Sequence, residues 1–224
     1  MKKRVFIIHG WKSSPADAWL PWLKKELEQK GYDVFVPVMP NPYKPDIAQW
    51  LSFLKKEIGE PDENTFLIGH SLGAFISLKY AEEIGKAGKI IGGIITVGGR
   101  VHKEGRPNVD PDLVKKGSPK IYSLFSDNDY YIPLSEEVYF RETLGAKTRV
   151  LHDRGHFSRL ENTNTLPEIL PLFSEIVSSL SLNYETRRRC WFCGASRRLA
   201  SRAEQFFSRK ICVHRKTCTE QRVL

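Results

Sequence analysis

One stretch constrains the fold of this chain more than any other: an apolar run, a tight turn and a helix follow one another directly. Residues 65–68 are typical of a buried parallel strand, the turn at residues 69–73 reads Gly-His-Ser-Leu-Gly, and a helical pattern begins at Ala74. In this setting G-x-S-x-G is typical of a nucleophile elbow, which lifts a serine to the top of a parallel sheet. The glycines are needed because side chains there would collide with neighbouring elements. A glycine-flanked turn without chemistry is the alternative.

The chain alternates short apolar runs with amphipathic stretches up to about residue 183. We expect strands at residues 5–8, 33–36, 65–68, 89–97, 120–125 and 148–151, and helices at 17–30, 45–58, 74–84, 134–144 and 166–180. This alternation favours an α/β fold, a three-layer sandwich with a mostly parallel central sheet. Ligands in such folds bind at the carboxyl ends of the strands. The polar gap at residues 98–118 is too short for a lid domain, so we expect an open site.

The C-terminal residues differ in composition from the rest of the chain. The net charge is +9, yet residues 185–224 hold 11 Lys and Arg against only 3 Asp and Glu. We therefore predict a globular domain over residues 1–183 and a basic, Cys- and Arg-rich tail over residues 184–224 that is disordered or loosely helical. Nucleic-acid binding is not expected of the nearly neutral body and would involve only the tail.

The tail also holds every cysteine of the chain. They are Cys190, Cys193, Cys212 and Cys218, and His214 lies between the last two. The first pair has a zinc-like spacing, but Cys212-x-His214 is a poor spacing for two tetrahedral ligands, so we expect no metal. No apolar run approaches the roughly 18 residues that span a bilayer. The apolar run behind the basic N-terminus is too short for a signal peptide. We expect a cytoplasmic protein without membrane association.

A serine nucleophile needs a general base, and in this architecture the base follows late in the chain. The body has five histidines, of which His152 and His156 follow the last expected strand. We favour His156, because Gly155 permits the tight turn that would carry the ring over the sheet towards Ser71. His152 is the alternative, since it lies closer to the end of the strand.

The base in turn needs an orienting acid, expected after the strand at residues 120–125. The segment that follows this strand offers Asp127 and Asp129. We prefer Asp129 for holding the histidine and Asp127 for ordering the turn. The spacing alone does not decide between the two aspartates.

Two backbone amides are candidates for stabilising an oxyanion. The amide of Leu72 lies at the start of the helix after the serine, and the loop after the first strand offers the amide of Trp11 or Lys12. Several aromatic residues fall near the expected top loops: Trp11, Tyr43, Tyr130, Tyr131 and Phe157. Some of them are candidates for an acyl pocket, whereas Trp19 and Trp22 are expected in the core. The substrate-binding residues remain unknown at this stage.

Together these motifs resemble the α/β-hydrolase superfamily, and most closely the small serine hydrolases typified by retinoblastoma-binding protein 9 and its bacterial relatives. The resemblance rests on residues 5–11, 69–73, 126–133 and 155–157, and it extends over about residues 2–182. It implies a catalytic serine, aspartate and histidine at Ser71, Asp129 and His156. It also implies that the reaction needs no metal and no organic cofactor. The tail has no counterpart in this family.

These observations predict a serine hydrolase that cleaves ester or amide bonds of a small substrate through an acyl-enzyme. The alternative is a non-catalytic protein-binding module on a hydrolase scaffold, so a protein partner is compatible with the sequence. Covalent labelling of Ser71 would distinguish the two hypotheses.

Overall fold

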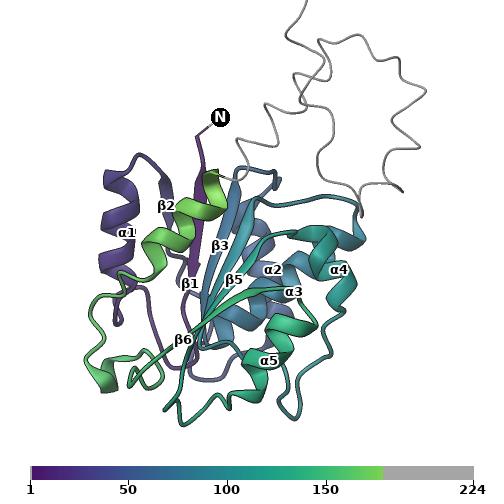
Figure 1. Ribbon diagram of the computed structural model, residues 1–224. Coiled ribbons are helices and arrows are strands. Elements are labelled where there is room, and N and C mark those ends of the chain that lie inside the picture. Colours follow the sequence, from purple (N-terminus) through teal and green to yellow (C-terminus); the bar gives the residue numbers. More distant parts are fainter. Residues whose placement is uncertain (1, 179–224) are drawn as a thin grey trace, which may run out of the picture. The chain divides into compact units, whose positions relative to one another are not determined.

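A six-stranded, wholly parallel sheet forms the centre of the computed structural model, which describes residues 2–178 (Figure 1). The strands are β1 (Arg4–Ile8), β2 (Asp33–Phe35), β3 (Thr65–His70), β4 (Gly93–Val97), β5 (Ile121–Ser126) and β6 (Lys147–Leu151). Their order in the sheet is β2-β1-β3-β4-β5-β6, and every neighbouring pair runs parallel. All six carboxyl ends therefore lie at one edge of the sheet.

Helices cover both faces of this sheet. They are α1 (Leu20–Gln29), α2 (Ile47–Ile58), α3 (Leu72–Lys86), α4 (Pro111–Gly117) and α5 (Ser135–Glu142), and residues 169–178 are also helical. Helix α1 and residues 169–178 pack into the apolar cluster on one face, whereas α2, α3, α4 and α5 contribute to the cluster on the other (Figure 1). The expected three-layer sandwich is confirmed.

Side-chain alternation along the strands explains the two clusters. On β1, Phe6 and Ile8 belong to the α2–α3 side, whereas Val5 and Ile7 belong to the α1 side. Every residue of β3 is buried, as expected for a central strand covered on both faces. The central strands thus bury side chains in both directions, whereas the edge strands β2 and β6 are more exposed.

The observed elements differ from the expected ones in two places. Strand β4 begins at Gly93 rather than at residue 89, because the Lys89 amide donates to the Ile84 carbonyl and closes the end of α3. Helix α4 lies in the polar gap at residues 98–118, where the sequence analysis placed no helix. Its start is marked by Asp110, whose side chain accepts from two amides, and by Pro111 in the first turn.

The region between β4 and β5 contains only the loop 98–110 and the short α4 among the described residues, so no lid domain is inserted there. The domain boundary predicted near residue 183 and the tail with its cysteines lie outside the described residues. No helix in the described part of the chain is long and apolar enough to cross a membrane.

Candidate active site

Ser71 lies in the turn between β3 and α3 with a strained backbone, at φ 53° and ψ −111°. A Cβ on Gly69 would lie 2.4 Å from the Gly73 carbonyl oxygen, and one on Gly73 would lie 2.2 Å from the Ile8 carbonyl oxygen. Both contacts are with backbone that has no room to move, so only glycine fits on either side. Ser71 occupies the N-cap of α3, yet its side chain makes no capping hydrogen bond. The sequence therefore builds a sharp elbow whose hydroxyl is not used to cap the helix.

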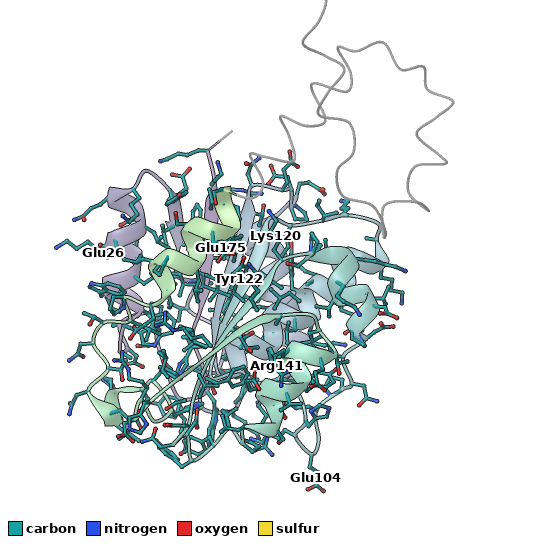
Figure 2. All side chains as sticks on the ribbon, in the orientation of Figure 1. Glu26, Glu104, Lys120, Tyr122, Arg141 and Glu175 are labelled. Atoms are coloured by element: carbon teal, nitrogen blue, oxygen red, sulfur yellow. The ribbon has the colours of Figure 1, made fainter. Side chains whose placement is uncertain are left out.

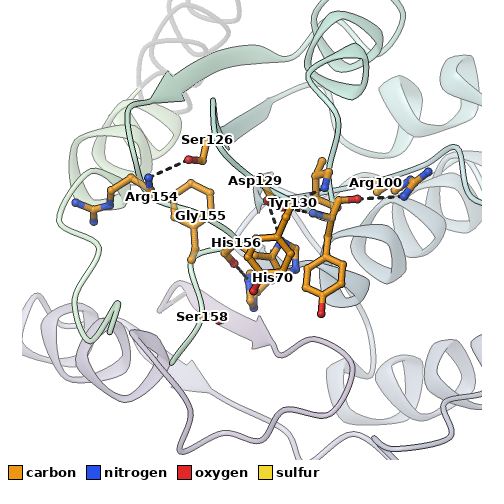
Figure 3. Close-up of polar contacts among 12 residues, drawn as sticks. His70, Arg100, Ser126, Asp129, Tyr130, Arg154, Gly155, His156 and Ser158 are labelled. Atoms are coloured by element: carbon orange, nitrogen blue, oxygen red, sulfur yellow. Dashed lines mark hydrogen bonds and ion pairs between the residues drawn. The ribbon is translucent and has the colours of Figure 1, made fainter. Parts of the chain in front are cut away.

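His156 and Asp129 form a hydrogen-bonded pair beside this elbow. His156 Nδ1 lies 2.8 Å from Asp129 Oδ2, and the two side chains are only 9% and 1% exposed (Figure 3). The other carboxylate oxygen of Asp129 accepts hydrogen bonds from the amides of Tyr131 and Ile132. The carboxylate is thus fixed on both oxygens and holds the imidazole in one orientation.

Asp127 and His152, the alternatives considered from the sequence, pair with each other instead. His152 Nδ1 lies 2.6 Å from Asp127 Oδ2, and the histidine side chain is 82% exposed. The hydrogen bond that His152 donates to the Asp127 carboxylate raises the pKa of His152, which favours the protonated ring, a form unable to accept a proton. Asp127 also accepts from the Asp153 amide. Neither residue lines the pocket at Ser71.

Two loops are joined residue by residue to carry the histidine. Ser126 and Asn128 accept from the amides of Arg154 and Gly155, in addition to the contacts of Asp127 and Asp129 (Figure 3). Each side chain of residues 126–129 therefore bonds the segment 153–156, and Asn128 also donates to the Asp153 carboxylate. This register fixes the position of His156 relative to the end of β5.

His70 and Trp19 anchor the same loop from the other side. His70 Nε2 lies 2.9 Å from the His156 carbonyl oxygen, and Trp19 Nε1 donates to the Phe157 carbonyl oxygen at 3.1 Å. Burial, together with the nearby charge of His156, lowers the pKa of His70 to about 4. His70 is therefore neutral at physiological pH and uses its Nε2 proton for this bond. Sequence reasoning placed Trp19 in the core but did not find either anchor.

The Ser71 hydroxyl and the His156 ring open onto the same pocket of about 610 Å³. Gly10, after β1, lies against the serine, since a Cβ there would be 3.1 Å from Ser71 Cβ. Gly98 lies against the histidine, with φ +54° and a Cβ position 3.3 Å from His156 Nδ1. Sequence reasoning did not identify these two glycines, because their role depends on contacts between distant segments.

The candidate amides differ in their availability. The Lys12 amide donates to the Pro42 carbonyl at 2.9 Å, so it is already used. The Trp11 amide has no backbone carbonyl partner among the described residues. Leu72 is the first residue of α3, where an amide has no acceptor within the helix. His9 Nδ1 bonds the Gly10 carbonyl and His9 Nε2 accepts from the Met39 amide, which fixes the loop carrying Trp11.

The aromatic residues expected near the site fall into two groups. Trp11, Tyr130 and Tyr131 line the pocket and are about half exposed. Tyr43 is exposed without lining it, and Phe157 is buried in the core. Trp19 is buried and Trp22 packs against the same apolar cluster, as expected.

One group of side chains in the described part of the chain has metal-ligand spacing: Asp127, His152 and Asp153, with ligand atoms within 4.8 Å of one another. All three are exposed, and both ring nitrogens of His152 already face a carboxylate. This group is an imidazole held between two aspartates.

Known proteins resemble this chain over the whole described domain. YdeN of Bacillus subtilis (strain 168) is 29% identical over 187 residues, which cover 80% of this chain and 98% of YdeN. Its crystal structure superposes with a TM-score of 0.74, covering 79% of this chain and all of that one. The serine hydrolase RBBP9 of Rattus norvegicus is 31% identical over 149 residues, 64% of this chain and 80% of RBBP9.

More distant structures share the fold. The α/β hydrolase MGS-MChE2, from a sediment metagenome, is 19% identical with a TM-score of 0.64, over 81% of this chain and 93% of that one. The sequence model that describes serine hydrolases matches residues 5–175, from β1 to the last described helix. The chain therefore belongs to the serine hydrolase family.

Proposed function

We propose that this protein hydrolyses an ester or amide bond of a small substrate through a covalent acyl-enzyme, with Ser71 as nucleophile, His156 as general base and Asp129 as the residue that orients it. The observation that supports this most directly is the buried His156–Asp129 pair, whose histidine lines the same pocket as a serine on a strained elbow. Asp129 accepts from Nδ1, which leaves Nε2 of His156 free to take a proton.

Acylation would begin when His156 Nε2 accepts the Ser71 hydroxyl proton while Oγ attacks the substrate carbonyl carbon. The carbonyl oxygen becomes an oxyanion, and the amides of Leu72 and Trp11 are the proposed donors to it. The C–O or C–N bond to the leaving group then breaks. The leaving group takes the proton from His156, and the acyl group stays on Ser71.

Deacylation would repeat these steps with water. His156 accepts a proton from the water molecule, whose oxygen attacks the acyl carbon, and the bond to Ser71 Oγ breaks as the proton returns to the serine. The carboxylic acid product leaves the pocket. The Asp129 carboxylate stabilises the imidazolium in both halves without itself becoming protonated.

Labelling with a fluorophosphonate probe tests this proposal directly, because the probe reacts only with an activated serine. We expect labelling of the wild-type protein, none in Ser71→Ala, and a rate lower by a factor of about 10³ or more in His156→Ala. Asp129→Asn should also label slowly, whereas Asp127→Asn and His152→Ala, the matched exposed pair, should label at nearly the wild-type rate. An unlabelled, folded wild-type protein would contradict the proposal and favour a non-catalytic protein-binding module.

A further inference from the structure

The pocket at Ser71 has more cationic than acidic side chains in its wall. The cations are Lys12, Arg100, Lys103, Arg106 and Arg159, and the acids are Asp17 and Glu104. Apolar and aromatic residues, among them Trp11 and Tyr131, line much of the remainder. Whether these charges attract a ligand depends on which of them are already neutralised within the protein.

Two of the arginines have acidic partners. Arg159 Nη1 lies 3.2 Å from Asp17 Oδ1. Arg100 Nε lies 3.9 Å from the buried carboxylate of Glu136, and its Nη1 donates to the Tyr131 carbonyl (Figure 3). These two guanidinium groups support the walls of the pocket and add little to its net charge.

Arg106 differs from these two arginines. It is half-buried, its guanidinium carbon lies 4.8 Å from the centre of the Phe75 ring, and one of its amino groups donates to the Arg100 carbonyl. No carboxylate in the described part of the chain lies within ion-pair distance of it. A guanidinium has five N–H donors, so most of them remain for a ligand. Burial and the nearby Arg100 lower the pKa of Arg106, and the charge of Glu136, which already faces Arg100, offsets this only in part. A partly desolvated cation without an ion-pair partner is costly to keep, which indicates a role in binding.

The remaining charges near Arg106 do not offset it. Lys12 and Lys103 are exposed and have no acidic partner among the described residues. Glu104, the one acid in the wall without a basic partner there, is exposed at the outer tip of its loop (Figure 2). The wall therefore keeps a positive charge, carried by Arg106, Lys103 and Lys12.

We propose that the substrate of this site carries an anionic oxygen group, a carboxylate or a phosphate, which binds Arg106 while the scissile carbonyl lies at Ser71. The placement of the scissile carbonyl at Ser71 rests on the proposed function, whereas binding of the anion at Arg106 does not. A guanidinium fork matches the oxygens of either anion in a bidentate geometry, and a lysine adds charge without direction. The open pocket of about 610 Å³ accommodates a small substrate with both groups.

Equilibrium binding to the full-length chain tests the anion site without requiring catalysis. Titration calorimetry would compare hexanoate, hexyl phosphate and neutral 1-hexanol, which share one alkyl chain. We expect at least one anion to bind about tenfold or more tightly than the alcohol, because a hydrogen-bonded charge pair contributes that much. The anion that binds more tightly identifies the group. The same affinity for all three compounds would overturn the proposal.

Variants separate Arg106 from the general charge of the chain. Arg106→Gln should abolish the preference for the anion, and Arg106→Lys should keep part of it. Arg149 is an exposed arginine on β6 outside the pocket. Arg149→Gln removes the same charge and should keep the full preference for the anion. A preference that survives in Arg106→Gln would overturn the proposal, because the anion would then bind elsewhere, for instance to the basic residues beyond position 184.

The turnover of matched esters adds the catalytic readout. The ratio of kcat/KM for monomethyl adipate to that for methyl hexanoate should exceed about ten in the wild type and approach one in Arg106→Gln. If the probe labels Ser71 but the kcat/KM ratio of the two esters is near one in the wild type, the anion site is contradicted and the hydrolase proposal stands. Arg106-dependent anion binding without labelling of Ser71 would contradict the hydrolase proposal alone.

Discussion

His70, at the second position of G-x-S-x-G, has a task separate from that of the serine that follows it. Its ring is buried against Trp19 and His156, and its Nε2 hydrogen bond reaches the His156 carbonyl. Because the pKa is lowered to about 4, the ring donates this bond as a neutral group. One side chain of the elbow therefore fixes the loop that carries the proposed base.

The lowered pKa of His70 predicts a pH-dependent stability. Below pH 6.5 the unfolded chain binds a proton at His70 that the folded chain excludes, so the free energy of unfolding falls as the pH drops from about 6.5 to about 4. The loss should reach about 3 kcal/mol, at about 1.4 kcal/mol for each unit of pKa. Urea unfolding at pH 7, 5.5 and 4.5 measures it. In His70→Gln, which keeps a donor but does not titrate, the decline should be smaller, and an equal decline would refute this origin.

Replacing Gly98 by alanine should disturb the site through a single added methyl group. In Gly98→Ala, the new Cβ would lie 3.3 Å from His156 Nδ1, on a residue with φ +54°. We expect a loss of about 1 kcal/mol in stability from the backbone conformation and a drop of about tenfold or more in the rate of fluorophosphonate labelling. Gly88→Ala is the matched control, with φ +68° and nothing within 4 Å. Gly88→Ala should lose stability but keep the wild-type labelling rate. Equal labelling rates of the two variants would contradict the expected effect.

At the residue scale, the sequence identified candidate side chains better than their partners. The choice between Asp127 and Asp129 stayed open, because the two lie two residues apart in one loop. Their partners become visible only when that loop meets residues 152–156 in space. The roles of Gly98 and His70 were missed for the same reason, since each depends on a contact with His156 far along the chain.

At the element scale, the two loops after β5 and β6 behave as one unit. Six hydrogen bonds join side chains of residues 126–129 to the facing loop, and three of the six involve its backbone amides. Amides are present whatever the side chain, so the arrangement tolerates sequence change in the second loop more easily than in the first. The orientation of His156 is therefore encoded mainly in residues 126–129.

Asn128→Ala tests this unit. The change removes the acceptor of the Gly155 amide and a bond to Asp153, at 2.7 Å and 3.2 Å. We expect a cost of about 1–2 kcal/mol in stability and a fall of about tenfold in labelling of Ser71, because the neighbouring His156 loses its fixed position. Asn64→Ala, in the turn before β3 at the opposite edge of the sheet, should leave labelling unchanged. Equal labelling of both variants would show that the loop is held without Asn128.

The elements themselves were predicted well where burial decides them. Strands β1, β3, β4 and β5 were found because each is a buried apolar run, and the long amphipathic helices because one face of each is apolar. Strand β6 was also found, although only Leu151 of its five residues is buried. Helix α4 was missed, although Asp110 followed by Pro111 is a start signal that could have indicated it. Its seven residues are too few for a periodic pattern, and its packing against α3 is visible only in the fold.

At the scale of the whole molecule, the parallel topology collects the site at one edge of the sheet. The loops after β1, β3, β4, β5 and β6 all contribute residues to the pocket or to the His156–Asp129 pair. The family match over residues 5–175 lies entirely within the domain predicted from composition. The fold class could thus be predicted from local patterns, whereas the charge of the pocket could not, because it depends on which ions are paired.

Truncation after residue 183 tests the predicted division of the chain. The shortened protein should unfold at the same denaturant concentration as the full chain and label Ser71 at the same rate, because the described core is complete before that residue. Any affinity of the full chain for DNA that falls steeply with salt should disappear. Chemical unfolding, probe labelling and DNA titration at two salt concentrations measure these outcomes. Loss of folding on truncation would show that the later residues belong to the domain.

The bond between His70 and His156 also sets an order of events during synthesis, because 86 residues separate the two partners. At about 5–20 residues per second, the ribosome adds the second partner roughly 4–17 s after the first. Throughout that interval the nascent chain carries its serine turn without the loop that must dock on it. Under the proposed function, a polypeptide released within it would contain the complete G-x-S-x-G motif and yet be inert, so reactivity at Ser71 would report that translation has passed the last strand.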